Sequence, residues 1–381
     1  MLRRLSETWR VVRPRAAAET RLAVNKLERG LSAARDDVKE LRQQARRHAE
    51  QQRSGFDALG AQLAEVRAAL GTQLAVLTKE LQALRGEHDR LQRREAQLRA
   101  VLQRDAALEA GEAGLAAALH TDGLHAHVRA AVAAAAMRTE PCPYIVVDDV
   151  LPAALYDAII TGLPPSEIFN DQPLNKAQVR VPFALAPAYS RRVWRHMVDT
   201  VVPDVLRPVL VERFRGVLDG WVRDSFPGLG DAERQALEFV ASDGRLLMRT
   251  RGYRIPPHRD PRWGFLTGIL YLAKPDDDER WGTQFYTVEG DVSAASALPH
   301  WIRDEQCHLV EDILFKPNRL IVFLNSTGAH GASIPDDAEP AGLERYIYQF
   351  RIGPPAEWIR RLVETLPESE RAAWRGKVGD Y

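Results

Sequence analysis

Hydrophobic positions recur at intervals of seven residues through the first quarter of the chain. One series consists of Val24, Leu31, Val38 and Ala45, with Leu27, Ala34 and Leu41 in the alternate position. The phase slips by one residue near Gly55, and leucine then occupies every seventh position, at Leu63, Leu70, Leu77, Leu84, Leu91 and Leu98. Such a repeat forms an apolar stripe along a helix, which a second helix must cover. Residues 1–115 are therefore predicted to form an α-helical coiled coil that makes the protein a homo-oligomer.

The stoichiometry of this coiled coil stays open, because the alternate core positions of the second repeat are mixed. They are apolar at Leu74, Leu81 and Leu102 but polar at Arg67, His88 and Glu95. Leucine in the other core position favours a parallel dimer. The alternative is a long helix that folds back on its own domain.

Residues 116–140 are rich in alanine and are predicted to form a solvated linker. They contain the stretch ALHTDGLHAHV, in which His120 and Asp122 stand two positions apart. On a helix, residues two apart point to nearly opposite sides and cannot share a metal ion. We therefore interpret Asp122-Gly123 as a helix break and expect no metal there.

From residue 141 onward, short runs rich in β-branched and aromatic residues alternate with turn residues. The runs are at 144–152, 245–255, 266–273, 283–288, 318–324 and 345–352. Asp243-Gly244 predicts a hairpin turn. Helices are expected at 152–163 and from Ser190, a predicted N-cap, until Pro203 and Pro208 break the second of them. The pattern predicts an α+β domain over 141–360, an antiparallel sandwich with helices outside, and a helical tail over 361–381.

Composition narrows the functional classes. The formal net charge of the 381 residues is zero, so no overall field recruits nucleic acid. Two distant cysteines, Cys142 and Cys307, indicate a reducing, cytoplasmic compartment rather than a disulfide framework. No apolar run approaches the roughly 20 residues of a transmembrane helix. The arginine-rich first 15 residues predict a basic lead-in to a helix, with a transit peptide or a membrane-surface helix as the alternative.

The stretch GYRIPPHRDPR at 252–262 carries the chemistry. His258 and Asp260 follow a strand pattern, and on a strand residues two apart share a face. His330 follows the apolar strand LIVFL and supplies a third ligand, whereas His300 and His308 lie in a polar segment and are predicted to be surface groups. Two histidines and one carboxylate with open metal positions form the site of non-haem Fe(II) oxygenases.

Arg345 opens the last predicted strand, 15 positions after His330. A cosubstrate with a free carboxylate needs a fixed cation, and a guanidinium donates two parallel hydrogen bonds to such a group. Arg345 is the candidate for this role, and an ion pair with a surface acid is the alternative.

Residues 252–351 resemble the prolyl-4-hydroxylase-like branch of the Fe(II)/2-oxoglutarate oxygenases. The resemblance is carried, in order, by GYRIPPHRD, LTGILYLAKP, WGTQFY, KPNRLIVFLNSTGAH and RYIYQFR. It implies a double-stranded β-helix (jelly-roll), Fe(II) held by His258, Asp260 and His330, and 2-oxoglutarate as cosubstrate, with ascorbate as a candidate reductant. It further implies that Arg345 binds the 2-oxoglutarate tail and that Tyr253 and Tyr271 line the cosubstrate pocket.

The sequence departs from the family at two points. Gly282-Thr283-Gln284-Phe285 stands where Gly-Gly-Glu-Leu is common, and a longer acidic loop precedes Gly342. The second departure leaves Arg345 and Arg351 as competing anchors of the 2-oxoglutarate tail.

The resemblance predicts a dioxygenase that hydroxylates a small molecule, a glycan or a protein side chain while 2-oxoglutarate is decarboxylated to succinate. The alternative is a catalytically inactive jelly-roll binding module presented by a coiled-coil scaffold. Several arginines surround the predicted metal strand, namely Arg249, Arg251, Arg254, Arg259 and Arg262. They either attract an acidic or phosphorylated substrate or are solvated strand-edge charges.

Overall fold

The computed structural model describes residues 2–108, 111–120, 122–172, 176–180, 183–261, 263–290, 300–325 and 327–371. The chain divides into two compact units, residues 1–90 and 91–381. None of the described helices is long and apolar enough to cross a membrane.

The first unit consists of helix α1 (Leu2–Leu108), which continues into the second unit. The long N-terminal helix predicted from the sequence is therefore present. Its heptad leucines are exposed in the single chain, for example Leu63 at 67 % and Leu84 at 63 %. These leucines are thus not buried by helix α1 itself, and the coiled coil stays a prediction.

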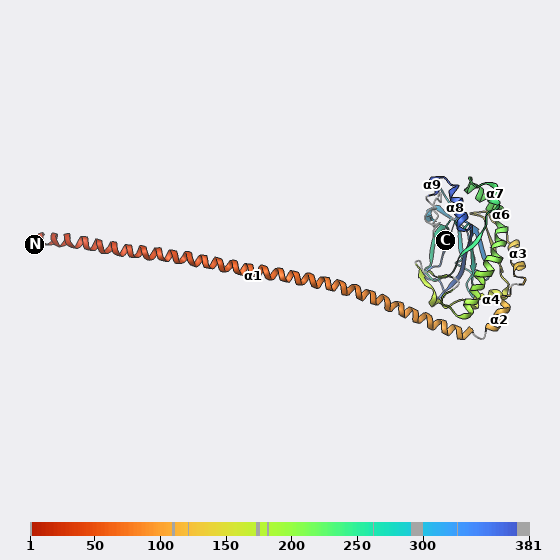
Figure 1. Ribbon diagram of the computed structural model, residues 1–381, viewed down its shortest axis with the longest axis horizontal. Helices are drawn as coiled ribbons and strands as arrows, with labels where there is room; N and C mark the ends of the chain where they lie inside the picture. The colour runs from red at the N-terminus through yellow and green to blue at the C-terminus, as the bar shows by residue number, and fades with distance from the viewer. Residues whose placement is uncertain are drawn as a thin grey trace. The chain divides into compact units, whose positions relative to one another are not determined.

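Two antiparallel sheets form the second unit (Figure 1). The larger sheet has the strand order β1 (Tyr144–Val147), β10 (Leu320–Leu324), β6 (Leu266–Tyr271), β12 (Arg345–Gly353), β4 (Val240–Arg249), β3 (Lys176–Arg180) and β2 (Asn170–Gln172). The smaller sheet has the order β8 (His300–Trp301), β5 (Arg254–Arg259), β11 (Ala329–Ser333), β7 (Thr283–Val288) and β9 (Cys307–Ile313). Mixed helices and antiparallel sheets confirm the predicted α+β class.

The two sheets pack face to face through a small apolar core. Ile269, Phe323 and Ile347 of the larger sheet share this core with Phe285 and Ile313 of the smaller sheet. Because side chains alternate along a strand, the odd-numbered residues of β12 from Arg345 to Arg351 point into this interior, as Ile347 does. The even-numbered residues point to the helices.

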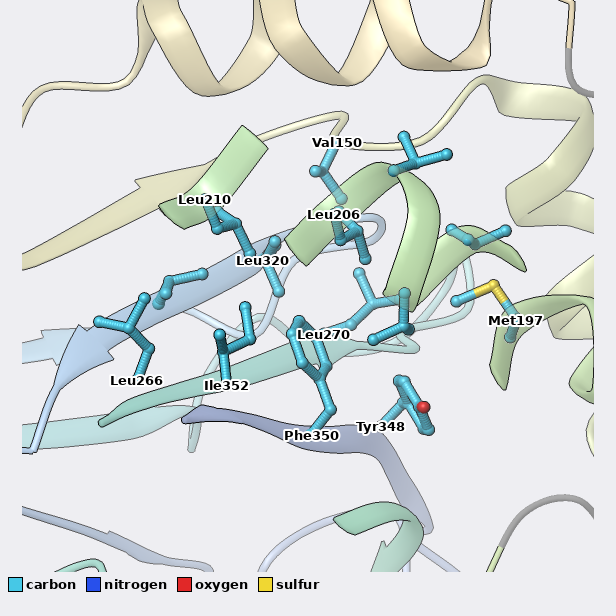
Figure 2. Packing of buried hydrophobic residues seen from close by; sticks show 14 of the residues in the cluster. Val150, Met197, Leu206, Leu210, Leu266, Leu270, Leu320, Tyr348, Phe350 and Ile352 are labelled. Atoms are coloured by element: carbon cyan, nitrogen blue, oxygen red, sulfur yellow. The ribbon is translucent and has the colours of Figure 1, made fainter. Parts of the chain in front are cut away.

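Helices cover the opposite face of the larger sheet. They are α2 (Glu112–Ala118), α3 (Leu124–Ala134), α4 (Ala153–Thr161), α5 (Ala188–His196), the π-helix η3 (Met197–Leu206), α6 (Arg207–Ser225) and α7 (Asp231–Gln235), while α8 (Ala356–Glu364) and α9 (Glu368–Arg371) follow the last strand. Short 3₁₀ turns stand at η2 (Ser166–Ile168) and η4 (Asp304–Gln306). Figure 2 shows Met197 and Leu206 of the helices packed over Leu270 of the sheet.

The predicted N-cap and the predicted proline breaks of the second helix are wrong. Ser190 does not cap its helix but is buried inside α5, which begins at Ala188 after Pro187. Pro203 lies within the π-helix η3, and Pro208 occupies the first turn of α6. Neither proline ends the helical run, which continues from residue 188 to residue 225.

The predicted hairpin at Asp243-Gly244 is also wrong, because β4 runs through it. Ser242 pairs with Arg351 and Arg245 pairs with Gln349, so two residues of β4 stand opposite a single residue of β12. This arrangement is a β-bulge, for which glycine in a strand is a signal. Arg245, Leu247 and Arg249 lie on one side of the bulge at intervals of two residues. Since Leu247 lies in the core between the sheets, the two arginines also face this interior.

Residues 116–140 differ from the expected linker. Helix α3 buries Leu124, Val128 and Val132 in the main core, with at most 2 % of each side chain exposed. These residues follow helical spacing, and their alanine-rich surroundings gave no contrast between a buried and a solvated face. Of the predicted tail, 361–371 includes the buried Leu362 and Val363 of α8, and 372–381 lies outside the described residues.

Candidate metal centre

Two histidines face each other across neighbouring strands. His258 on β5 stands directly opposite His330 on β11, and their ring centroids lie 4.2 Å apart. The antiparallel pairing of β5 with β11 therefore brings together two side chains that are 72 positions apart in the sequence.

Asp260 completes the group. It follows the last residue of β5, and its Oδ1 lies 3.8 Å from His258 Nε2 while its Oδ2 lies 3.9 Å from His330 Nε2. All three side chains are buried. Among the described residues they form a group able to hold a metal ion, with ligand atoms within 4.8 Å of one another. Two metal–ligand bonds of roughly 2.0–2.2 Å span at most about 4.4 Å, so the separations of 3.8 Å and 3.9 Å from Asp260 are within reach of one ion.

Neighbouring groups fix the orientation of these ligands. Thr267 Oγ1 donates a hydrogen bond to Asp260 Oδ2 over 2.7 Å, and Arg351 Nη2 donates one to Asp260 Oδ1 over 3.1 Å. His258 Nδ1 lies 2.9 Å from the carbonyl oxygen of Pro256. A carbonyl only accepts, so Nδ1 carries the proton and the Nε2 lone pair points toward Asp260. Hydrogen bonds of this kind set the tautomer and basicity of metal ligands.

The charge states also suit a metal. Burial lowers the pKa of His258 and lowers that of His330 to about 3, so both rings are neutral near pH 7. Burial alone would raise the pKa of Asp260, but Arg351 and the two histidines lower it below its usual range. Neutral imidazoles and an ionised carboxylate are the protonation states that bind a metal. This donor set fits Fe(II), with the remaining metal positions open.

The second pair, His120 and Asp122, lies between α2 and α3 rather than on a helix, so the expected projection of the two side chains to opposite sides is wrong. The two side chains form an ion pair of 2.9 Å and are 65 % and 87 % exposed. Gly123, with a φ of 79°, immediately precedes α3 and separates it from α2. Such high exposure agrees with the solvated surface predicted for this pair.

Arg345 is buried without a hydrogen-bond partner. Only 1 % of its surface is exposed, and none of its three guanidinium nitrogens has a partner among the described residues. Its guanidinium carbon lies 4.5 Å from the centre of the Phe315 ring and 5.5 Å from that of Trp281. Burial lowers the pKa of Arg345. A buried cation in this condition is costly unless a ligand pairs with it.

Two buried hydroxyls lie in the same region. Tyr271 packs against Phe315, with ring centroids 4.8 Å apart. The hydroxyls of Tyr271 and Thr283 make no hydrogen bond of good geometry within the described part of the chain. The neighbouring Gly282 has no side chain, and a Cβ built there would lie 2.9 Å from the Tyr271 hydroxyl. Arg345 and Tyr271 thus both lie against the Phe315 ring, and Thr283 lies near the Tyr271 hydroxyl.

Tyr253 belongs to a different apolar cluster, against which Trp281 packs. It is buried in a small cluster with Ala332 and Ile334, and the guanidinium carbon of Arg249 lies 4.9 Å from the centre of its ring. Its predicted place in the cosubstrate pocket stays a prediction.

Trp301 is a neighbour of the site that the sequence analysis missed. It pairs with His258 through β8, their ring centroids are 5.1 Å apart, and 54 % of its surface is exposed. Only the pairing of β8 with β5 brings it there, and no local motif marks it.

Solved structures similar to this chain include a prolyl-4-hydroxylase from Pseudomonas putida, with 15 % identity over 60 % of this chain and 99 % of that one and a TM-score of 0.35. HygX from Streptomyces hygroscopicus, with nickel, 2-oxoglutarate and hygromycin B bound, has 14 % identity over 55 % and 82 %, with a TM-score of 0.33. A 2OG-Fe(II) oxygenase family oxidoreductase from Burkholderia pseudomallei has 10 % identity over 60 % and 89 %, with a TM-score of 0.33.

No protein-family model and no curated protein matches the chain. The structures to which the chain is similar are prolyl-4-hydroxylases and other 2OG-Fe(II) oxygenases, the group that residues 252–351 resemble.

Proposed function

We propose that this protein is an Fe(II)- and 2-oxoglutarate-dependent dioxygenase. The observation that carries the proposal is the pairing of a buried His258–Asp260–His330 group with a buried cation, Arg345, that has no partner of its own. A metal site and a separate unpaired guanidinium are what a chelating dicarboxylate needs at its two ends. The two facing antiparallel sheets support a double-stranded β-helix as the fold of this domain.

His258, Asp260 and His330 would hold the iron. When bound, the iron supplies the redox chemistry by which a substrate C–H group, 2-oxoglutarate and dioxygen become a C–OH group, succinate and carbon dioxide. The protein's own contribution is orientation. Thr267 and Arg351 hold the Asp260 carboxylate, and Pro256 holds the His258 ring.

Arg345 would bind the far carboxylate of 2-oxoglutarate, with the hydroxyls of Tyr271 and Thr283 as further donors. The competing candidate, Arg351, already donates to Asp260. A guanidinium engaged in holding a metal ligand is less available to a cosubstrate. The described contacts therefore favour Arg345 over Arg351 as the anchor.

Helix α1 would hold two or more copies together. Its exposed heptad leucines support a coiled coil through residues 1–115, with the oxygenase domain beginning near residue 141 or, given the buried helix α3, before it. Ascorbate as a reductant belongs to the family resemblance alone and is proposed on that basis.

The test is anaerobic loading with Fe(II), followed by addition of 2-oxoglutarate and oxygen and measurement of succinate by mass spectrometry. We expect stoichiometric iron and succinate release in the wild type, and loss of both in His258→Ala. His308→Ala is the matched control, because His308 is 57 % exposed and pairs with Glu289.

Two outcomes separate the alternatives. Iron and 2-oxoglutarate binding without succinate would favour the inactive binding module. Normal iron content and turnover in His258→Ala would show that the site is misassigned. Screening candidate small molecules, glycans and peptides for coupled gain of one oxygen atom would then identify the substrate.

A further inference from the structure

Three cations stand side by side on neighbouring strands of the larger sheet. Lys176 on β3 pairs with Arg249 on β4, and Arg249 pairs with Arg345 on β12. Directly paired residues of antiparallel strands lie on the same face of a sheet. That face is the interior one, since Leu247 and Ile347, two positions away, lie in the core between the sheets. Like charges in direct register destabilise a sheet, so the row calls for an opposite charge.

Arg249 has part of its guanidinium unsatisfied inside the protein. Only 6 % of its surface is exposed, its Nε has no partner among the described residues, and its guanidinium packs on the Tyr253 ring. The other arginines of the metal strand differ. Arg251 and Arg259 donate to the carbonyl oxygens of Asp336 and Gly328.

The remaining arginines of this strand are also accounted for. Arg254 pairs with the carboxylate of Asp304 at the surface, and Arg262 lies outside the described residues. Among these arginines, Arg249 is therefore the one that faces the site from a buried position.

Lys176 connects this row to the metal centre. Burial lowers the pKa of Lys176, the charges of Arg249 and Arg245 lower it further, and the charge of Asp260 opposes them. The strand pairing agrees with this, because Lys176 stands directly opposite Arg249. Lys176 and Arg245 are half-buried, whereas Arg345 is fully buried. The Lys176 side of the row thus reaches solvent, and the Arg345 side does not.

One dicarboxylate cannot neutralise the whole row. In the proposed function, 2-oxoglutarate uses one carboxylate at the metal and the other at Arg345. Lys176 and Arg249 then receive no carboxylate from 2-oxoglutarate, although Lys176 is the partly exposed end of the row.

We infer that Lys176 and Arg249 form a second oxyanion site, next to the metal, that binds a carboxylate or phosphate of the substrate to be oxidised. That the bound anion belongs to a substrate rests on the proposed function. That an anion binds here rests on the row of cations alone. A guanidinium and an ammonium together suit an oxyanion. The substrate class is therefore an acidic molecule or an acidic group on a larger one.

The test is equilibrium dialysis of radiolabelled inorganic phosphate, and separately of acetate, against the full-length protein. The protein is loaded with Mn(II), a redox-inert stand-in for iron, and saturated with 2-oxoglutarate. We expect one anion to bind per chain in the presence of 2-oxoglutarate. Lys176→Met and Arg249→Met should each weaken it about ten-fold or more, the worth of one charge-assisted hydrogen bond. Lys316→Met, a surface lysine beside Glu279, is the matched control.

The outcomes are distinct. Binding of phosphate but not acetate identifies a phosphate group, and binding of both identifies a general oxyanion site. Complete displacement of the anion by 2-oxoglutarate, or unchanged binding in Lys176→Met, would overturn the inference. Phosphate binding is also measured with the metal-free protein, so that the anion site is tested independently of the proposed function. If the protein bound phosphate but neither Mn(II) nor 2-oxoglutarate, the proposed function would be wrong and the anion site would stand. Lys176 is only partly buried, so its replacement removes no side chain of the apolar clusters.

Discussion

Arg351 donates a hydrogen bond to Asp260 across 3.1 Å, at the opposite end of β12 from Arg345. The two arginines point into the same interior, but only one of them is engaged with the metal centre. In the proposed function, Arg351 would hold a ligand of the metal, and Arg345 would bind the cosubstrate.

Arg345→Met should weaken 2-oxoglutarate binding while metal binding is kept. The variant loses two charge-assisted hydrogen bonds to the cosubstrate, and each is worth about 1.5–3 kcal/mol, so the Kd should rise at least about a hundred-fold. Calorimetric titration of the Mn(II)-loaded protein with 2-oxoglutarate measures this. Arg360→Met, on an exposed turn of α8, is the control, and a wild-type Kd in Arg345→Met would remove Arg345 from the site.

Arg351→Met should have the converse effect. Without its hydrogen bond, the Asp260 carboxylate loses a fixed orientation, and loss of such a contact typically costs about 10–100-fold in metal affinity. Competition for Mn(II) with a chelator of known affinity measures the change. If metal affinity were unchanged and 2-oxoglutarate binding were lost, Arg351 would be the tail anchor and the two roles would be exchanged.

Metal binding should raise the thermal stability of the second unit. Any ligand that binds only the folded state at 100 times its Kd adds about 2.7 kcal/mol, because the three ligands are assembled only when β5 pairs with β11. Differential scanning calorimetry with Mn(II) and with a chelator should therefore give separate transition temperatures in the wild type. The same shift is expected in His308→Ala and none in His330→Ala, so a metal shift that persisted in His330→Ala would place the ion elsewhere.

Gly282→Ala should destabilise the fold at the edge of the site. A Cβ at this position would lie 1.8 Å from the carbonyl oxygen of Ile313 and 2.9 Å from the Tyr271 hydroxyl, so the backbone of β7 would have to move from β9. Overpacking of this kind costs about 1–3 kcal/mol. Chemical denaturation measures the free energy of unfolding. Gly216→Ala in α6 is the control, because nothing lies within 4 Å of its added Cβ, and it should gain about 0.5–1 kcal/mol.

The sequence was most informative where ligands are local or fall at strand ends. His258 and Asp260 follow from two-residue alternation on a strand, and His330 from its place directly after an apolar strand. Their mutual distances could not be predicted, because they depend on which strands pair and in what register.

Lys176 and Trp301 were missed for the same reason. Each lies in a short strand without a motif, and pairing with β4 or β5 alone brings it to the site. Asp243-Gly244 misled because the same dipeptide suits a hairpin and a bulge, and only the partner strand decides between them. The burial of helix α3 was not predicted, because alanine fits both a core and a solvated surface.

Placing aspartate in the heptad stripe should dissociate the assembly. Leu77 and Leu84 are 61 % and 63 % exposed in the single chain, and a coiled coil would bury both against the same positions of a second copy. Leu77→Asp with Leu84→Asp would bury two charges per helix, each costing several kcal/mol. Sedimentation equilibrium of the full chain should then give the monomer mass, with the oxygenase domain still folded. Lys79→Asp, on the outer face of the same turn, should leave the oligomer unchanged. A monomeric wild type, or an unchanged mass in the double variant, would mean that the leucine stripe is not an interface between copies.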